Sequence, residues 1–345
     1  MLVHLRLTAP TDLSDRVRET LCAPDWVTNV TWQRDAVIDP PGDLFECDVA
    51  REKAGALLDK LEHCGLKEHG SILVLDPSGA PFAKAEELEE VAPGHPDDAV
   101  IWEQVADDAE SGADPTVSYH LFLVLAVVLA AVAVLTDSAV LVVGAMVVGP
   151  DFGVVAAASA GIVLGRWRLV RRSLQLLLLS FVLAIAVVAL LCLVGRATGM
   201  IDVADVTRAR PNTGFIWRPD QWSVVVALTA GAAGVLALSI QKTSTMVGVF
   251  ISVTTVPAAG NLALGLAFLE TGEILGSLAQ LGINLAGMLV AGTLVLGIQR
   301  RWWIPITAGA ERVFRATSYG NDDGGDAASA PGHSRDEGID VRDEE

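Results

Sequence analysis

The sequence lacks the residue patterns on which most enzymes build a catalytic or metal site. It has no glycine-rich nucleotide loop, no histidine–glutamate pair within an apolar run and no serine with a matching base. Its histidines do not have the spacing of metal ligands. We therefore expect no enzyme activity, no cofactor and no metal site.

Cysteine is scarce, and its spacing shows no pairs. The four cysteines are Cys22, Cys47, Cys64 and Cys192. This distribution indicates reduced, structural thiols rather than a disulfide framework. The first residues, MLVHLRLTAP, contain no long apolar core, so we expect no secretory signal peptide there.

Charge is concentrated at the two ends of the chain and nearly absent from its middle. The net charge is -18, yet 52% of the residues are hydrophobic and the mean hydropathy is +0.46. These values coexist because residues 1–116 and 316–345 hold most of the acids. Acidic ends argue against a nucleic-acid partner, since nucleic acids bind basic side chains.

Six apolar runs fill the middle, each close to the roughly 20 residues that cross a bilayer. They cover residues 117–136, 138–165, 172–195, 222–241, 246–269 and 274–299. With six spans both termini share one side, which carries nine Arg and Lys residues near the spans against four on the other. Positive charge favours the cytoplasmic side. We expect a multi-pass protein of the cell membrane, surrounded by the lipid bilayer, with both termini cytoplasmic.

Two of these runs are interrupted in their middle. The second contains Gly149, Pro150, Asp151 and Gly153, and the fifth contains Pro257 and Gly260, so that Pro-x-x-Gly recurs at an offset of 107. Proline removes a helix hydrogen bond, and the freed backbone groups need a protein or water partner within lipid. Each break is therefore either a packing feature or part of a binding site.

Six spans divide into three and three, and each half has its broken helix second. An odd number of spans per half requires the halves to lie in opposite orientations. This is the pattern of inverted-repeat transporters, whose sites form at discontinuous helices. We expect an all-α bundle of six membrane helices, two of them broken, in a 3+3 inverted repeat.

Asp151 is the strongest candidate for a functional side chain. A charge within the membrane costs roughly 2.5–3.5 kcal/mol on insertion scales, which favours binding of a cation or a proton. The alternative is that Asp151 stabilises the start of the second half-helix, where a carboxylate complements the positive helix end. The two roles are compatible.

Three further polar residues lie within the spans: Thr255, Asn261 and Asn284. The asparagines could bond across helices and stabilise packing, or contact a substrate. A hydroxyl beside the second break could repair the broken backbone or coordinate an ion. The candidate site comprises Gly149, Pro150, Asp151, Gly153, Thr255, Pro257, Gly260, Asn261 and Asn284.

The chain before the spans has the pattern of a small α+β domain. Strands are expected at 2–8, 27–33, 43–50 and 71–76, and helices at 12–22 and 51–64. The order βαββαβ is that of the ferredoxin-like fold. We divide the chain into a cytoplasmic domain at 1–76, an acidic linker with a helix at 77–116, six spans at 117–300 and a cytoplasmic tail at 301–345, disordered after about 316.

Four motifs within the spans resemble one family. GAMVVGPDFG, RARPN, AGAAG and VGVFISVTTVPAAG are similar to the hydrophobic membrane family catalogued as domain-of-unknown-function three-eight-nine, over roughly residues 118–300. That family usually has Ser-Pro-Leu-Met-Gly-Pro where this chain has Gly149 to Val154, and often a double proline where it has Pro257-Ala258. Asp151 is therefore not carried over as a functional residue of the family.

Two functions remain open at this point. The first is a transporter or channel for an ion or small solute, with a site at the breaks and a cytoplasmic regulatory domain. The alternative is a membrane scaffold or signalling protein, in which the soluble domain binds a ligand or partner. In either case we expect a homo-oligomer, a trimer or dimer, because small domains of this kind expose sheet edges that pair.

Overall fold

The chain begins with a small unit built on one antiparallel sheet. The computed structural model describes residues 2–77, 82–91, 99–240 and 255–319. The first elements are β1 (Leu2–Ala9), α1 (Ser14–Cys22), β2 (Val27–Ile38), β3 (Pro41–Ala50), α2 (Arg51–His63), α3 (Leu66–His69) and β4 (Ser71–Leu75). The strand order is β2-β3-β1-β4, and every pairing is antiparallel. The predicted order of strands and helices is found, with α3 as a short addition before the last strand.

Alternation along β3 produces the core of this unit. Phe45, Cys47 and Val49 are fully buried, and the residues between them point to the other face of the sheet. The buried residues pack in one cluster with Val17 of α1 and Leu57 of α2. Both helices therefore cover the same face of the sheet.

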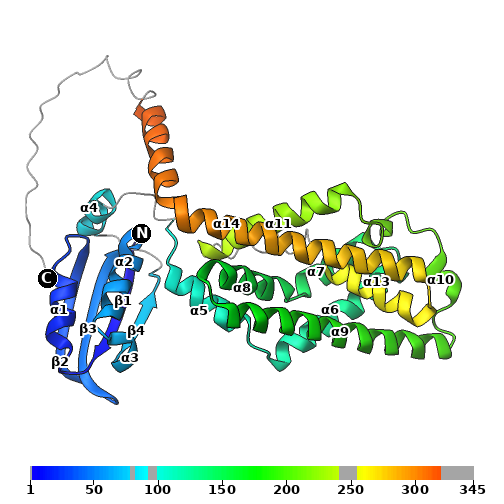
Figure 1. Ribbon diagram of the computed structural model, residues 1–345, viewed down its shortest axis with the longest axis horizontal. Helices are drawn as coiled ribbons and strands as arrows, with labels where there is room; N and C mark the ends of the chain where they lie inside the picture. The colour runs from blue at the N-terminus through cyan, green and yellow to red at the C-terminus, as the bar shows by residue number, and fades with distance from the viewer. Residues whose placement is uncertain (1, 78–81, 92–98, 241–254, 320–345) are drawn as a thin grey trace, which may run out of the picture.

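Two helices connect this unit to the rest of the chain (Figure 1). They are α4 (Ala83–Val91) and α5 (Trp102–Gly112), and both lie in segments where helices were predicted. Ile101, just before α5, is buried in the core of the N-terminal unit, whereas Val105 and Ala109 are buried in the core of the following helices. The segment formed by Ile101 and α5 thus contributes side chains to both cores.

The remaining helices include four that are long and apolar enough to cross a membrane. These are α6 (Val117–Leu135), α9 (Trp167–Ala197), α11 (Gln221–Ser239) and α14 (Thr271–Tyr319). A fifth candidate is the pair α7 (Ala139–Val148) and α8 (Asp151–Leu164), which is bent by 52° at the predicted break. The sixth predicted run is represented by α13 (Thr255–Phe268), and its first part, 246–254, lies outside the described residues.

The outward faces of these helices are apolar, as lipid contact requires. On α9, Leu178, Leu179 and Val182 are 67%, 66% and 57% exposed. An exposed apolar surface of this extent is characteristic of a membrane-facing helix rather than of a soluble bundle. The helices are those of a membrane protein.

The last helix differs from its prediction. The last span was expected to end at 299 and the disordered tail to start at about 316, but α14 is one continuous helix as far as Tyr319. Figure 1 shows its C-terminal part leaving the bundle. The rest of the tail, 320–345, lies outside the described residues.

The helices recur along the chain at one constant spacing. α11 begins and ends 104 residues after α6, and α13 begins and ends 104 residues after α8. Both α8 and α13 are followed by a residue with positive φ, Gly165 and Leu269, and then by a long helix, α9 or α14. The spacing of the elements is therefore 104, not the 107 that the Pro-x-x-Gly motif indicated.

Candidate functional site

The first break is built by a glycine and a proline between two helices. α7 ends at Val148, and α8 starts at Asp151 after Gly149 and Pro150. A proline cannot donate a backbone hydrogen bond and is tolerated where a helix starts. Asp151 is the first residue of α8, where a carboxylate is favoured by the partial positive charge of the helix end. Its side chain is nevertheless buried, with 6% of the residue exposed.

The second break lies against the first. The hydroxyl of Thr255, the first residue of α13, donates a hydrogen bond of 2.6 Å to Oδ2 of Asp151. A β-carbon on Gly149 would lie 2.6 Å from Cγ2 of Val256, so the backbones approach closely. The two breaks therefore lie in contact, through residues that are 104 positions apart.

Proline plays a different part in the second break. Unwinding was expected around Pro257, but Pro257 is the third residue of α13 and lies within its first turn. In the first turn the missing N–H has no intrahelical acceptor to lose, so proline leaves the helix intact. Residues 241–254, which precede α13, lie outside the described residues.

Polar side chains of α6 and α9 lie beside one another. Nε2 of His120 on α6 is 3.2 Å from Oγ of Ser180 on α9. Tyr119, next to His120, packs against the core of the membrane helices. These residues are not among those predicted from the sequence, although two polar aromatic residues in the first turn of an apolar run are a usable signal.

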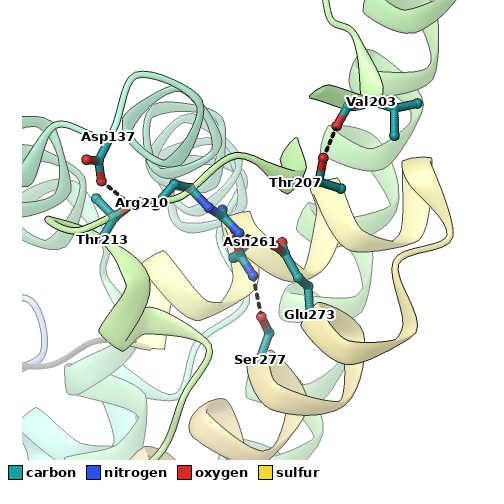
Figure 2. A network of polar contacts seen from close by, with 8 residues as sticks. All are labelled: Asp137, Val203, Thr207, Arg210, Thr213, Asn261, Glu273 and Ser277. Atoms are coloured by element: carbon teal, nitrogen blue, oxygen red, sulfur yellow. Dashed lines mark hydrogen bonds and ion pairs between the residues drawn. The ribbon is translucent and has the colours of Figure 1, made fainter. Parts of the chain in front are cut away.

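Asn261 belongs to a separate network near the α13–α14 turn, shown in Figure 2. Its Oδ1 accepts a hydrogen bond of 2.8 Å from Nη1 of Arg210, and its Nδ2 donates one of 2.8 Å to Oγ of Ser277. Arg210 also forms an ion pair with Glu273. The Arg210 side chain is only 3% exposed. Charged groups with so little solvent need such partners, so this network fixes the turn.

The pairing of Arg210 with Glu273 was not predicted from the sequence. An arginine outside the predicted spans would ordinarily face water, but Arg210 is buried. Glu273 lies immediately before the predicted sixth span, where a carboxylate is typical of the end of a span. Their pairing depends on the fold of the segment 198–220, which contains α10 (Val203–Thr207) and the short helix η2 (Gly214–Ile216).

The same segment is tied to the α6–α7 turn. The carboxylate of Asp137 accepts hydrogen bonds from the hydroxyl of Thr213, at 2.9 Å, and from the backbone and side-chain nitrogens of Asn212. Partial burial raises the pKa of Asp137, but these hydrogen bonds outweigh that effect and hold the pKa below its ordinary value. Asp137 is therefore ionised at neutral pH and fastens the segment.

The nine predicted site residues thus fall into separate places. Gly149, Asp151 and Thr255 meet at the breaks, with Pro150 and Pro257 in the adjoining backbone. Gly153 lies in the first turn of α8, beside the end of α5. The other three lie elsewhere: Gly260 against Ala130 and Ala131 of α6, Asn261 in the Arg210 network, and Asn284 beside Gln280 on α14.

The group at the breaks has the chemistry of a small-ion site. A buried carboxylate with one hydroxyl partner can exchange that hydrogen bond for a cation or a proton. Within the described residues, no group of three or more His, Cys, Asp or Glu side chains is placed to hold a metal ion.

Comparison with known proteins gives a family match over the region that contains both breaks. Residues 146–290 match the family model named Domain of unknown function (DUF389), which confirms the resemblance inferred from the motifs. The chain is similar to Uncharacterized protein MJ0678 of Methanocaldococcus jannaschii, at 25% identity over 257 residues, covering 72% of this chain and 74% of the relative. No solved structure matches the chain. The matched segment contains both breaks and the Arg210 network.

Proposed function

We propose that this chain, whose residues 146–290 match the family model named Domain of unknown function (DUF389), is a transporter or channel for an ion or small solute. Its binding site lies where the two broken spans meet, and its N-terminal ferredoxin-like domain is regulatory. The observation that carries the proposal is the buried contact between Asp151 and Thr255. Burial of a carboxylate between two helix ends within a membrane is costly, and a bound cation or proton would offset that cost.

The constant spacing of 104 residues supports a 3+3 inverted repeat. Asp151 and Thr255 occupy equivalent positions, as the first residues of α8 and α13. In an inverted repeat, equivalent residues close to the pseudo-two-fold axis touch each other. Sites of secondary transporters lie at this axis, between discontinuous helices.

The carboxylate indicates which class of solute is bound. Asp151 is the acidic residue at the break, and its hydrogen-bond partner Thr255 is a neutral hydroxyl. An ionised carboxylate in this setting attracts a monovalent cation or a proton more than an anion. We also propose that the protein is a homo-oligomer, a trimer or dimer, with both termini in the cytoplasm.

The experiment compares two substitutions of Asp151 in proteoliposomes. Asp151→Asn keeps the size of the side chain and its ability to accept a hydrogen bond, but removes the charge. It should abolish cation or proton flux while leaving expression and thermal stability nearly unchanged. Asp151→Leu, which restores the residue type usual in the family, should also abolish flux.

The matched control is Asp220→Asn, the same chemical change at the first turn of α11. Asp220 caps that helix through a hydrogen bond from the backbone of Ser223, and asparagine caps equally well. Flux should persist in this control. Normal flux in both Asp151 variants would show that Asp151 serves only the helix start and does not bind the solute. Absence of flux in the parent protein would favour the scaffold alternative.

A further inference from the structure

The helix α5 connects the N-terminal unit to the broken span. As described above, Ile101 at its start is buried in the first core, while Val105 and Ala109 are buried in the second. Its first turn also packs on α2, since a β-carbon on Gly55 would lie 3.6 Å from Oε2 of Glu103. A displacement of the N-terminal unit therefore moves α5 with it.

The other end of α5 reaches the break itself. A β-carbon on Gly112 would lie 3.3 Å from the backbone oxygen of Gly153 and 4.0 Å from Cβ of Ala157. Gly153 is two residues from Asp151, in the first turn of α8. Ala113, which follows α5, is fully buried. The end of α5 thus covers the part of α8 that carries the carboxylate.

Two ion pairs hold α5 in this place. Glu110 pairs with Arg166, just beyond the end of α8, and Asp114 pairs with Arg172 on α9. All four side chains are about half exposed, and such pairs are individually weak. Contacts of this strength can hold one position without preventing movement to another.

The second half of the membrane region is covered in a corresponding way. The segment that precedes it carries Arg210, which binds Asn261 on α13 and Glu273 just beyond α13. Each half-helix is therefore covered by the chain segment that leads into its half. The charges are reversed, because the covering segment is acidic at α8 and basic at α13.

We infer that α5 is the gate on the cytoplasmic side of the site, and that the N-terminal unit operates it. A ligand or partner that favours a shifted position of the N-terminal unit would withdraw α5 from α8 and open the break, by a shift of population between two arrangements. The inference rests on the proposed function for what passes the gate. Access to the break can be measured without any transport.

The test uses a cysteine at position 157, on the face of α8 that the end of α5 covers, as the probe of access. Ala157 is fully buried, and its β-carbon would lie 4.0 Å from a β-carbon on Gly112, so the reactivity of Ala157→Cys depends on the position of α5. The four native cysteines are replaced, and the rate of labelling by a water-soluble maleimide is measured in inside-out vesicles. Gly112→Leu, which forces α5 away from Gly153, should raise this rate by about fivefold or more, the change expected for a shift of about 1 kcal/mol.

A second variant distinguishes an effect on the gate from misfolding caused by the added bulk at Gly112. Glu110→Gln with Asp114→Asn removes both ion pairs without changing side-chain size, and should raise the labelling rate at least about twofold. The matched control is Glu87→Gln, which breaks the exposed 2.7 Å pair with Lys84 on α4 and should leave the rate unchanged. Gly282→Leu on α14, at an exposed glycine with open space around it, controls for the added bulk at Gly112.

The results separate the gate from the transport activity. Faster labelling together with altered flux supports both proposals. Faster labelling in a protein without measurable flux supports the gate and counts against transport. Unchanged labelling in both variants, in protein that elutes as the parent does, overturns the gate whatever the flux.

Discussion

At the scale of single residues, the contact between Asp151 and Thr255 makes the most specific prediction. The two residues hold equivalent positions, each at the first residue of a half-helix, where a carboxylate is favoured. The exchange of both residues, Asp151→Thr with Thr255→Asp, preserves one carboxylate and one hydroxyl between the helix ends. We expect the double variant to retain flux and thermal stability close to those of the parent.

The single variants should each fail for a different reason. Asp151→Thr leaves two hydroxyls and no charge, and Thr255→Asp places two carboxylates in contact. Thr255→Val removes the hydrogen bond to the buried carboxylate and should cost about 1.5 to 3 kcal/mol of stability. Thermal unfolding in detergent and flux in proteoliposomes measure both effects. If the double variant is no better than Asp151→Thr alone, the two positions are not equivalent.

Individual polar residues also define the limit of prediction from the sequence. Asp151 could be selected because a carboxylate beside a proline within an apolar run is unusual. Arg210 could not, since an arginine outside a span is ordinarily solvated, and its partners Asn261 and Glu273 lie 51 and 63 residues further along the chain. Such a network depends on tertiary proximity, for which local sequence has no signal.

At the scale of elements, helix packing depends on glycines that admit a neighbouring backbone. A β-carbon on Gly231 of α11 would lie 2.5 Å from Cα of Met288 on α14. Because the obstacle is backbone rather than a flexible side chain, Gly231→Ala must push the two helices apart. We expect a loss of about 1 to 3 kcal/mol, the usual cost of overpacking a well-packed contact.

The matched control is Gly282→Ala on α14, where a methyl group meets open space. Alanine is the better helix former by about 1 kcal/mol, so this variant should be neutral or slightly more stable. Thermal unfolding of both variants in the same detergent compares them directly. Equal stability would mean that α11 and α14 do not pack as closely as described.

The elements also show where pattern analysis succeeds and where it misleads. Alternation located β3, and apolar length located α6, α9 and α11, because both signals depend only on local spacing. The motif-based offset of 107 was wrong by three residues. Pro150 precedes α8, whereas Pro257 lies within the first turn of α13, so the two prolines are not equivalent.

At the scale of the whole molecule, both halves are fastened to the segment that joins them. Asn212 and Thr213 bind Asp137 at the α6–α7 turn, while Arg210 binds Glu273 beside the α13–α14 turn. The segment thus spans one end of the bundle, and α5 covers the half-helix of the first half from the side of the N-terminal unit. This arrangement predicts that the two covering segments lie on opposite sides of the membrane.

Cysteine labelling of intact cells tests this prediction. The native Cys22 is exposed in the N-terminal unit and should react only after the membrane is permeabilised. In a protein without native cysteines, Arg208→Cys and Asp220→Cys should react with an impermeant maleimide from outside. Arg168→Cys and Arg171→Cys, both at exposed positions, should react only from inside.

The orientation of the turns also distinguishes inverted halves from halves that run in the same direction. The positive-inside rule predicts a cytoplasmic α8–α9 turn, since Arg166, Arg168, Arg171 and Arg172 lie in or next to it. If the halves are inverted, the corresponding α13–α14 turn lies outside, so Glu270→Cys should react from the external face. Labelling of Glu270→Cys from inside, together with Arg168→Cys, would mean that the halves run in the same direction, and the site between two opposed half-helices would lose its basis.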